Sequence, residues 1–228
     1  MTMKSDADFE KMKVAGAVVA AAHDAVRAAA VPGVTMLELD AIAHEVIRQG
    51  DCRPSFLGYH GFPASICASP NEVIVHGIPD GYKLRDGDVL SIDVGAIYDG
   101  WHGDAAFTMA VGEVAPEAQR LIELTEQGLW AGIAAAQPGK RLGDVGAAIS
   151  AVAARHGYGV VREYIGHGIG RQMHEAPDVP NYGRPGRGLK LKPGMAIAIE
   201  PMFNLGTAET AVLDDGCTVV TQDKKLSA

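Results

Sequence analysis

Cysteine and clustered basic residues are scarce in this 228-residue chain. Its 3 cysteines, Cys52, Cys67 and Cys217, stand at irregular spacing, which argues against a disulfide framework or a CxxC metal site and suits a reducing compartment. The 28 acidic residues outnumber the 20 basic ones, and no long basic stretch offsets the formal charge of −8. We therefore expect no nucleic acid partner, because binding to a phosphate backbone needs clustered Lys and Arg side chains.

Long apolar runs and targeting signals are also missing. No segment reaches the roughly 18 consecutive apolar residues that a membrane span needs. The first residues include acids and show neither an Arg-rich nor an apolar leader. Hydrophobic residues nevertheless make up 47% of the chain, which is enough for a large buried core. We expect a single globular unit, monomeric and cytoplasmic, without a membrane contact.

Apolar residues at helical spacing predict four helices arranged in two pairs. They span residues 7–30, 36–49, 116–136 and 142–156. Pro32-Gly33 and Pro138-Gly139 end the first helix of each pair, about half the chain apart. This spacing predicts a duplicated unit, with halves at about 6–111 and 112–228 related by a pseudo-twofold axis. Ordinary helix-stop chemistry is the alternative explanation for the repeated Pro-Gly pair.

Between the helices the apolar period changes toward two, which is typical of strands. The candidates are residues 65–69, 72–75, 89–96, 101–111, 160–164, 195–202 and 218–221. Gly, Pro and Asp-Gly, which are typical turn residues, separate these segments and favour a largely antiparallel sheet. Helix pairs around such a sheet predict an α+β fold rather than a doubly wound one.

Two aspartates on neighbouring predicted strands carry most of the functional argument. Asp93 and Asp104 flank an Asp99-Gly100 turn signal, in strands that contain no Lys or Arg. A two-residue turn would place Asp93 opposite Ala106 and Asp104 opposite Gly95, so that the Cβ atoms of the two aspartates lie roughly 7–8 Å apart or less. Two buried carboxylates at that distance suit a pair of cations, and a salt bridge is the alternative.

Further metal-binding residue types follow in the second half of the chain. His167 and His174 lie in a segment with glycine at alternate positions, which disfavours a helix. His174 does not belong to an HExxH helix, so the mechanism of that peptidase class does not apply. Glu200 ends a predicted strand whose neighbouring positions on the same face are alanines, which leaves room for a ligand.

In this order, the motifs resemble the type I methionine aminopeptidases of the pita-bread metallopeptidase family. The resemblance covers nearly all residues from Phe9 onward. It rests on NEVIVHGIP at 71–79, on the hairpin of Asp93 and Asp104, on GHGIG at 166–170 and on IEPM at 199–202. It implies a pita-bread fold in one catalytic domain made of two pseudo-symmetric halves. It also implies removal of the initiator methionine from nascent chains, near the ribosome.

The resemblance further implies a role for each polar residue. The implied ligands of two divalent ions, which would be Co, Mn, Fe or Zn, are Asp93, Asp104, His167 and Glu200. Two such ions would lower the pKa of a shared water and hold the resulting hydroxide against the scissile carbonyl. Glu200 would also act as general base, His174 would stabilise charge on the carbonyl oxygen, and His76 would contact the amide being cut.

A methionine pocket is implied by position as well. Its residues would be Tyr59, Phe62, Cys67 and Met173, with His76 and His174 also contacting the substrate. Apolar and sulfur-bearing walls suit a flexible thioether, although each residue can equally be ordinary core. Cys217 stands where many relatives carry Trp, and Met173 stands where many carry Phe. We therefore expect a softer or wider pocket than usual.

One family residue is not found in this sequence. A second bridging glutamate would stand in a strand just after Ser227-Ala228. We expect a chain without it to bind metal weakly, with as few as one ion, and to be less active. Two other functions stay open: a catalytically silent peptide-binding module of the same fold, and an aminopeptidase of the Xaa-Pro type. The full set of polar residues argues against the first, and the lack of a large N-terminal domain argues against the second.

Overall fold

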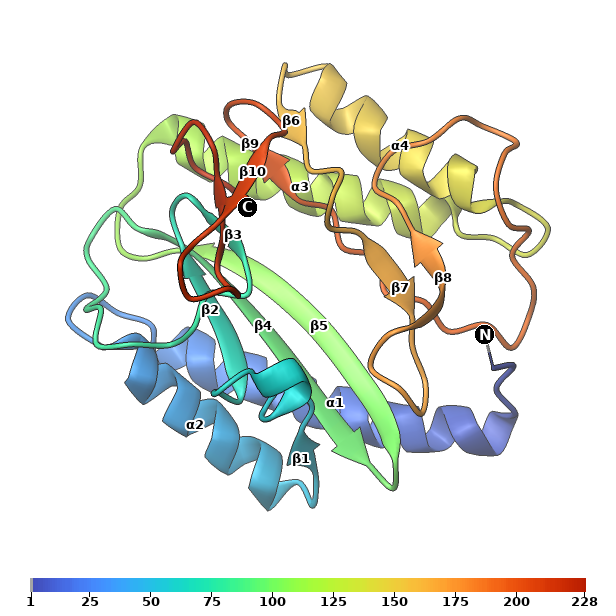
Figure 1. The fold of residues 1–228 in the computed structure, drawn as a ribbon, viewed down its shortest axis with the longest axis horizontal. Helices are drawn as coiled ribbons and strands as arrows, with labels where there is room; N and C mark the ends of the chain where they lie inside the picture. The colour runs from blue at the N-terminus through green and yellow to red at the C-terminus, as the bar shows by residue number, and fades with distance from the viewer. Residues whose placement is uncertain (1) are drawn as a thin grey trace.

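Two helix pairs bracket the strands in the computed structural model, which describes residues 2–228 (Figure 1). The helices are α1 (Asp6–Ala29), α2 (Met36–Gln49), α3 (Pro116–Ala135) and α4 (Leu142–Ala154), with a short 3-10 turn, η1, at Tyr59–Gly61. The two members of each pair pack against each other. The four predicted helices are confirmed, and their ends lie within two residues of the predicted ones.

Local sequence explains where these helices begin. Before α1, the Ser5 hydroxyl accepts a hydrogen bond from the backbone N–H of Asp8 at 3.3 Å, and the Asp8 carboxylate accepts one from the Ser5 N–H at 2.9 Å. Thr35 and Glu38 form the same reciprocal cap before α2. Pro116 is the first residue of α3, where its missing N–H costs no helical hydrogen bond.

A four-stranded antiparallel sheet lies against α1 and α2 and shares a core with them. Its strands are β1 (Arg53–Pro54), β2 (Ile66–Pro70), β4 (Val89–Tyr98) and β5 (Trp101–Ala110). The long strand β4 pairs with the other three. Leu39 and Ile47 from α2 and Ile92 from β4 are fully buried in this first core, which fixes the outward face of β4 and therefore the side on which Asp93 lies.

The β4–β5 hairpin has the register that the sequence predicted. Asp93 lies opposite Ala106, and Asp104 lies opposite Gly95. The turn residues Asp99 and Gly100 both have positive φ, 47° and 77°, as a tight two-residue hairpin turn requires. β5 then runs close to α1, because a Cβ on Gly103 would lie only 2.6 Å from the backbone nitrogen of Gly16. Glycine at 103 thus sets the depth at which Asp104 enters the site.

The remaining strands are short and form three small sheets. They are β3 (Val73–Val75), β6 (Gly159–Val160), β7 (Gly166–Gly168), β8 (Glu175–Val179), β9 (Phe203–Asn204), β10 (Thr210–Val212) and β11 (Val219–Thr221). β3 pairs with β11 and β11 with β10, while β6 pairs with β9 and β7 with β8. The antiparallel pairing expected from the sequence is confirmed in all of these ladders.

Two strand predictions are wrong in extent. The predicted strand 160–164 is reduced to β6, because the backbone turns after Val160. The predicted strand 195–202 is not a strand: it makes a single bridge, from Ile197 to Gly168, although the Ala198 N–H donates to the His167 carbonyl at 2.7 Å. Pro193 and Pro201 flank this extended segment, and prolines cannot donate ladder hydrogen bonds.

A second core lies between α3, α4 and the C-terminal strands. Its fully buried members include Leu121, Ile149 and Phe203. Met195, Ile197 and Ile199 pack against this core, as the predicted alternation of faces required, and Ala196 packs in a separate apolar cluster. We propose that the two helix-pair units are the duplicated halves, residues 6–111 and 112–228.

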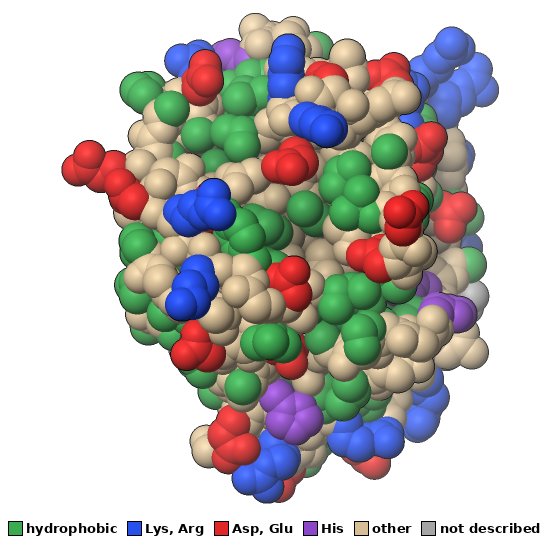
Figure 2. Space-filling model, turned by 60° about the vertical axis from the view of Figure 1, so that its left-hand side comes forward, with side chains coloured by type: hydrophobic (Ala, Val, Ile, Leu, Met, Phe, Trp, Pro, Cys, Tyr) green, Lys and Arg blue, Asp and Glu red, His purple; other side chains and the backbone are tan. Residues whose placement is uncertain are grey.

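The surface carries charges of both signs. On the face in Figure 2, Lys and Arg side chains are interspersed with Asp and Glu, and hydrophobic side chains lie between them. That face therefore presents no extended patch of a single sign. None of the helices found within residues 2–228 has the length and apolar character needed to cross a membrane.

Candidate metal centre

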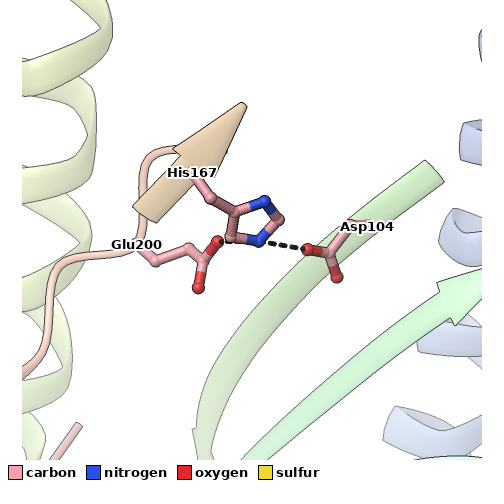
Figure 3. Close-up of side chains that lie close together, drawn as sticks. All are labelled: Asp104, His167 and Glu200. Atoms are coloured by element: carbon pink, nitrogen blue, oxygen red, sulfur yellow. Dashed lines mark ion pairs between the residues drawn. The ribbon is translucent and has the colours of Figure 1, made fainter. Parts of the chain in front are cut away.

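Three of the predicted ligands meet between the two helix pairs. Asp104 comes from β5, His167 from β7, and Glu200 from the extended segment before Pro201; one ligand atom of each lies within 4.8 Å of the others. His167 Nε2 is 3.5 Å from Asp104 Oδ2 and 3.2 Å from Glu200 Oε1 (Figure 3). Residues far apart in sequence thus converge on one point, as the sequence motifs predicted.

Asp93 lies beside this group but is not one of the three converging ligands. Burial raises the pKa of the Asp93 carboxyl well above 3.8, and repulsion from Asp104 and Glu200 raises it further. Burial likewise raises the pKa of Glu200, although His167 acts in the opposite direction. Three carboxylates held so close together need a cation, or protons, to offset their charge.

The chemistry of the donor atoms fits a divalent metal. Asp104 Oδ1 is buried and lacks a hydrogen-bond partner among the described residues, and buried Glu200 Oε1 has only the ion-pair contact with His167 Nε2. Nδ1 of His167 donates to the Gly168 carbonyl at 2.9 Å, since a carbonyl can only accept, so the Nε2 of a neutral ring keeps a free lone pair toward the acids. Buried carboxylate oxygens and one oriented imidazole form an oxygen-rich set typical of Mn, Fe, Co or Zn sites.

The pKa of His167 reflects the negative charge of the neighbouring carboxylates. Burial acts to lower its pKa, but the Asp104 and Glu200 carboxylates outweigh burial and raise the pKa from 6.5 to about 10. In the metal-free protein His167 is therefore the cation that balances the acids. A metal ion at the same point would take over that function and leave the imidazole neutral.

Glu200 is fixed by a residue that the sequence did not reveal. Asn181 Nδ2 donates to the Glu200 carbonyl at 2.7 Å, and Asn181 is fully buried at 0% exposure. This contact holds the backbone of an irregular segment in place at the ligand itself. Asn181 stands between Pro180 and Tyr182 without a recognisable motif, so no pattern in the sequence could have identified it.

His174 and His76 lie near the ligands as neutral imidazoles. Partial burial, and then repulsion from His167, lower the pKa of His174 from 6.5 to about 4. The ring centroids of His174 and His167 are 4.1 Å apart, and His174 Nδ1 lies 2.8 Å from the Tyr59 hydroxyl. Partial burial also lowers the pKa of His76, whose φ of 59° places it in the left-handed region. Each ring, although neutral, can donate a hydrogen bond from its one protonated nitrogen.

The residues expected to bind methionine do gather in one apolar cluster. Phe62, Cys67 and Met173 are buried in it, and Tyr59 and Cys217 pack against them. The cluster also contains three residues that the sequence analysis did not name: Phe56, Ala64 and Ile169. Because Tyr59 reaches His174, the apolar cluster borders directly on the ligand group.

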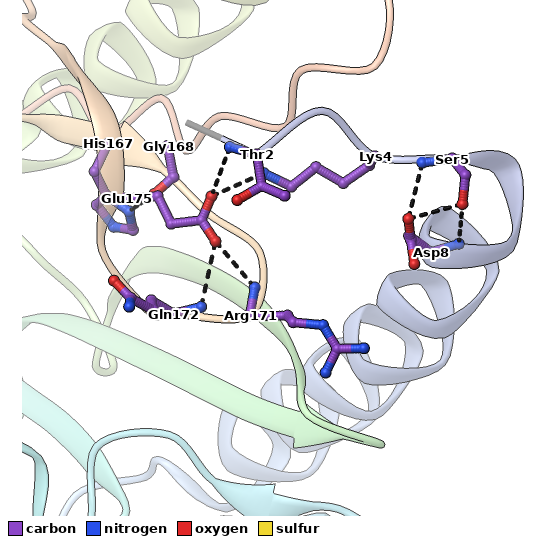
Figure 4. Close-up of polar contacts among 9 residues, drawn as sticks. All are labelled: Thr2, Lys4, Ser5, Asp8, His167, Gly168, Arg171, Gln172 and Glu175. Carbon is purple, nitrogen blue, oxygen red and sulfur yellow. Dashed lines mark hydrogen bonds and ion pairs between the residues drawn. The ribbon is translucent and has the colours of Figure 1, made fainter.

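A buried ion pair holds the loop that carries His174. Lys4 Nζ lies 3.1 Å from Glu175 Oε2, and the two side chains are only 1% and 6% exposed. The other carboxylate oxygen of Glu175 accepts hydrogen bonds from the backbone N–H groups of Arg171 and Gln172, at 3.1 and 3.4 Å (Figure 4). The Lys4 N–H donates to the Gly194 carbonyl at 2.8 Å. The N-terminal segment therefore connects the His174 loop to the segment that leads to Glu200.

Replacing Lys4 with methionine is expected to lower the free energy of unfolding by about 3 kcal/mol, because removal of one partner leaves the other charge buried and unpaired. Thermal and urea unfolding would measure this loss. The matched control is Lys13→Met, which breaks an exposed pair with Glu10 and should change stability by no more than about 0.5 kcal/mol. Equal effects of the two substitutions would contradict the structural importance of the buried pair.

Comparison with known proteins agrees with this geometry. The sequence model of metallopeptidase family M24 matches residues 10–222. The methionine aminopeptidase of Clostridium acetobutylicum is 48% identical over 99% of this chain and 91% of its own length. Methionine aminopeptidase 1 of Mycobacterium tuberculosis is 53% identical over 99% of this chain and 87% of its own length.

Solved structures give the same answer for the fold. The methionine aminopeptidase from Rickettsia prowazekii superposes with a TM-score of 0.98 at 44% identity, over 100% of this chain and 92% of that one. Prolidase from Pyrococcus furiosus shares the fold with a TM-score of 0.76 at 20% identity, over 99% of this chain and 60% of the prolidase. The α+β pita-bread fold predicted from the sequence is thus confirmed, and the chain belongs to metallopeptidase family M24 and is similar to its methionine aminopeptidases.

Proposed function

We propose that this chain removes the N-terminal methionine from polypeptides by metal-dependent hydrolysis of the first peptide bond. The observation that carries the proposal is the junction of two features: the ligand group of Asp104, His167 and Glu200, and an apolar cluster of suitable chemistry that borders it. The relatives named methionine aminopeptidase support the same substrate. An N-terminal methionine can then fill the cluster while its carbonyl reaches the polar group.

We further propose that Asp93, Asp104, His167 and Glu200 hold two divalent ions drawn from Co, Mn, Fe and Zn. When bound, such ions lower the pKa of a water molecule and polarise the scissile carbonyl. The count of two is part of the proposal, and a single ion is the alternative outcome of a metal analysis. Inductively coupled plasma mass spectrometry on the purified chain would give the number.

The chain's own residues supply the remaining steps. Glu200 accepts the proton of the attacking water, because its carboxylate belongs to the ligand group beside which the water would be held. If Nδ1 of His174 accepts from the Tyr59 hydroxyl, its Nε2 carries the proton and can donate to the carbonyl oxygen as negative charge develops there. His76 contacts the amide being cut. The apolar residues Phe62, Cys67 and Met173 hold the thioether and exclude water.

The proposed setting is the cytoplasm, with nascent chains near the ribosome as substrates and a monomeric enzyme. A silent binding module of this fold has no need for a neutral His174 next to His167 and its carboxylate partners, so catalysis is the better explanation of the site. Similarity to prolidases concerns the fold alone at 20% identity, and does not favour Xaa-Pro cleavage.

Peptide hydrolysis tests this proposal directly. The purified chain with added Mn²⁺ or Co²⁺ should release methionine from Met-Ala-Ser and leave both Ala-Ala-Ser and Ala-Pro-Ser intact. EDTA should abolish the release, and fresh metal should restore it. Cleavage of Ala-Pro-Ser would favour the Xaa-Pro alternative, and binding of all peptides without cleavage would favour the silent module.

A further inference from the structure

An open cleft of about 830 Å³ adjoins the apolar cluster. Tyr59, Met173 and His174 belong to its lining, and the same Tyr59 and Met173 also pack in the apolar cluster. These side chains thus form a common rim between the two spaces. A peptide with its methionine in the cluster and its carbonyl at His174 can continue past this rim into the cleft.

The cleft has an unusual charge for this protein. Its lining contains Arg53, His60, His102 and Arg171 but no aspartate or glutamate. The chain as a whole has 28 acidic and 20 basic residues, so a lining without acidic residues differs from the average composition of the chain. Within residues 2–228, neither Arg53 nor Arg171 takes part in an ion pair. Two guanidinium groups therefore face solvent without a carboxylate bound to them.

Both arginines stand on anchored backbone. Arg53 belongs to β1 and pairs with Ile97 of β4. The backbone N–H of Arg171 donates to Glu175, and its guanidinium lies 4.8 Å from the centre of the Trp101 ring, in a cation–π contact. The acids whose carboxyls lie close enough to respond to the charge of Arg171 have other partners: Asp8 accepts hydrogen bonds from Ser5, and Asp99 is paired with Lys11 at 2.5 Å. The Arg171 guanidinium is therefore positioned in advance, the Arg53 side chain projects from an anchored strand, and neither is bound to a carboxylate among the described residues.

His102 also belongs to the lining of the cleft but is largely buried. It is 8% exposed, and its Nδ1 lies 2.9 Å from the Ser55 hydroxyl. The permanently charged side chains of the lining are therefore Arg53 and Arg171, and both residues are exposed. Planar guanidinium groups bind carboxylates with two parallel hydrogen bonds.

We propose that this cleft is a subsite for an acidic side chain of the substrate, two or three residues after the methionine, bound by Arg53 and Arg171. The inference rests on the proposed function, because that function sets the direction in which the peptide leaves the site. It assigns to this chain a preference among nascent sequences that the methionine pocket alone does not give.

The test uses amidated peptides that differ at one position: Met-Ala-Glu-Ala-NH2, Met-Ala-Gln-Ala-NH2 and Met-Ala-Lys-Ala-NH2, with a second set carrying the variable residue one place later. The wild-type chain should show a KM roughly 3- to 5-fold lower for Glu than for Gln, as expected for exposed ion pairs, with Lys the weakest. In R53Q/R171Q the Glu preference should disappear, so that the KM values for the Glu and Gln peptides become equal. The control R187Q removes an exposed arginine outside the cleft and should keep the preference.

Further arms separate the possible causes. Free-acid Met-Ala-Gln-Ala measures whether a terminal carboxylate occupies the cleft in place of a side chain. Titration calorimetry of the same amidated peptides measures binding even if no bond is cut, so failure of the proposed function would not hide the cleft. Equal binding of Glu and Gln peptides by the wild-type chain, or an equal preference in R53Q/R171Q, would overturn the proposal.

Discussion

Replacing Asp104 with asparagine is expected to lower kcat/KM for Met-Ala-Ser by at least about 1,000-fold, since several kcal/mol of transition-state stabilisation depend on the bound metal. Asp104 is the central member of the group. Its carboxylate lies against His167, acts on the pKa values of both Asp93 and Glu200, and has one buried oxygen without a partner. Asparagine keeps the volume but removes the charge.

The loss should arise through the metal and not through the fold. Metal content and calorimetric metal affinity should fall in parallel with activity, while the metal-free Asp104→Asn protein should unfold no earlier than the metal-free wild type. The control is Asp178→Asn, because Asp178 pairs with His167 in the β7–β8 ladder but is exposed to solvent. That variant should keep its activity within about twofold, as surface substitutions usually have small effects. Full metal content in an inactive Asp104→Asn protein would show that Asp104 acts in some other way.

The part of the site that the sequence predicted best is the part controlled by local geometry. The Asp99-Gly100 turn fixes the hairpin register, and this places Asp93 and Asp104 on one face without any knowledge of the rest of the chain. The helix ends follow equally local signals, such as the caps at Ser5 and Thr35. These elements were predictable because each depends on a few neighbouring residues.

The rest depends on contacts that no local pattern encodes. The segment before Glu200 has the alternation of a strand, yet it finds only a short partner in β7 and stays irregular. Its ligand is held by Asn181, and the His174 loop is held by Lys4, which is separated from Glu175 by 171 positions in sequence. Long-range hydrogen bonds of this kind appear only when the two halves are packed together. The sequence therefore supplied the candidate polar residues, of which the structure brings Asp104, His167 and Glu200 together, and the structure added the residues that hold them.

Removing the metal is expected to reverse the dependence of stability on pH. In the metal-free protein the folded-state pKa of His167 is raised from 6.5 to about 10, so its stabilising contribution is complete below 6.5 and is lost as the pH rises toward 10. Asp93 acts in the same direction between 3.8 and its raised pKa, because over that range the folded state retains a proton that the unfolded state has released. The free energy of unfolding should fall by about 2 kcal/mol between about pH 7.5 and about pH 9.

The range starts at about pH 7.5 because other histidines act in the opposite sense at lower pH. The pKa values of four histidines are lowered in the folded state, namely His23, His76, His102 and His174. These lowered pKa values make the stability of the folded state increase with pH. The increase ends once the histidines of the unfolded chain are also deprotonated. Above that point the slope comes mainly from His167 and the acid cluster, and the raised pKa values of the buried thiols Cys52 and Cys67 add to it in the same sense as the pH nears 9.

With saturating Mn²⁺ the slope should change sign or vanish, because the metal binds deprotonated ligands and binds more tightly as the pH rises. Asp93→Asn separates the two states most clearly. It removes from the metal-free protein a buried carboxyl that burial and its acidic neighbours disfavour in the charged form, so that protein should gain about 1 kcal/mol or more near pH 8. It also removes a ligand from the metal-loaded protein, which should lose stability. Urea unfolding in EDTA and in Mn²⁺, at about pH 7.5 and about pH 9, would measure both effects. If Asp93→Asn shifted the two states in the same direction, Asp93 would not be a metal ligand, and its burial among the acids would need a different cause.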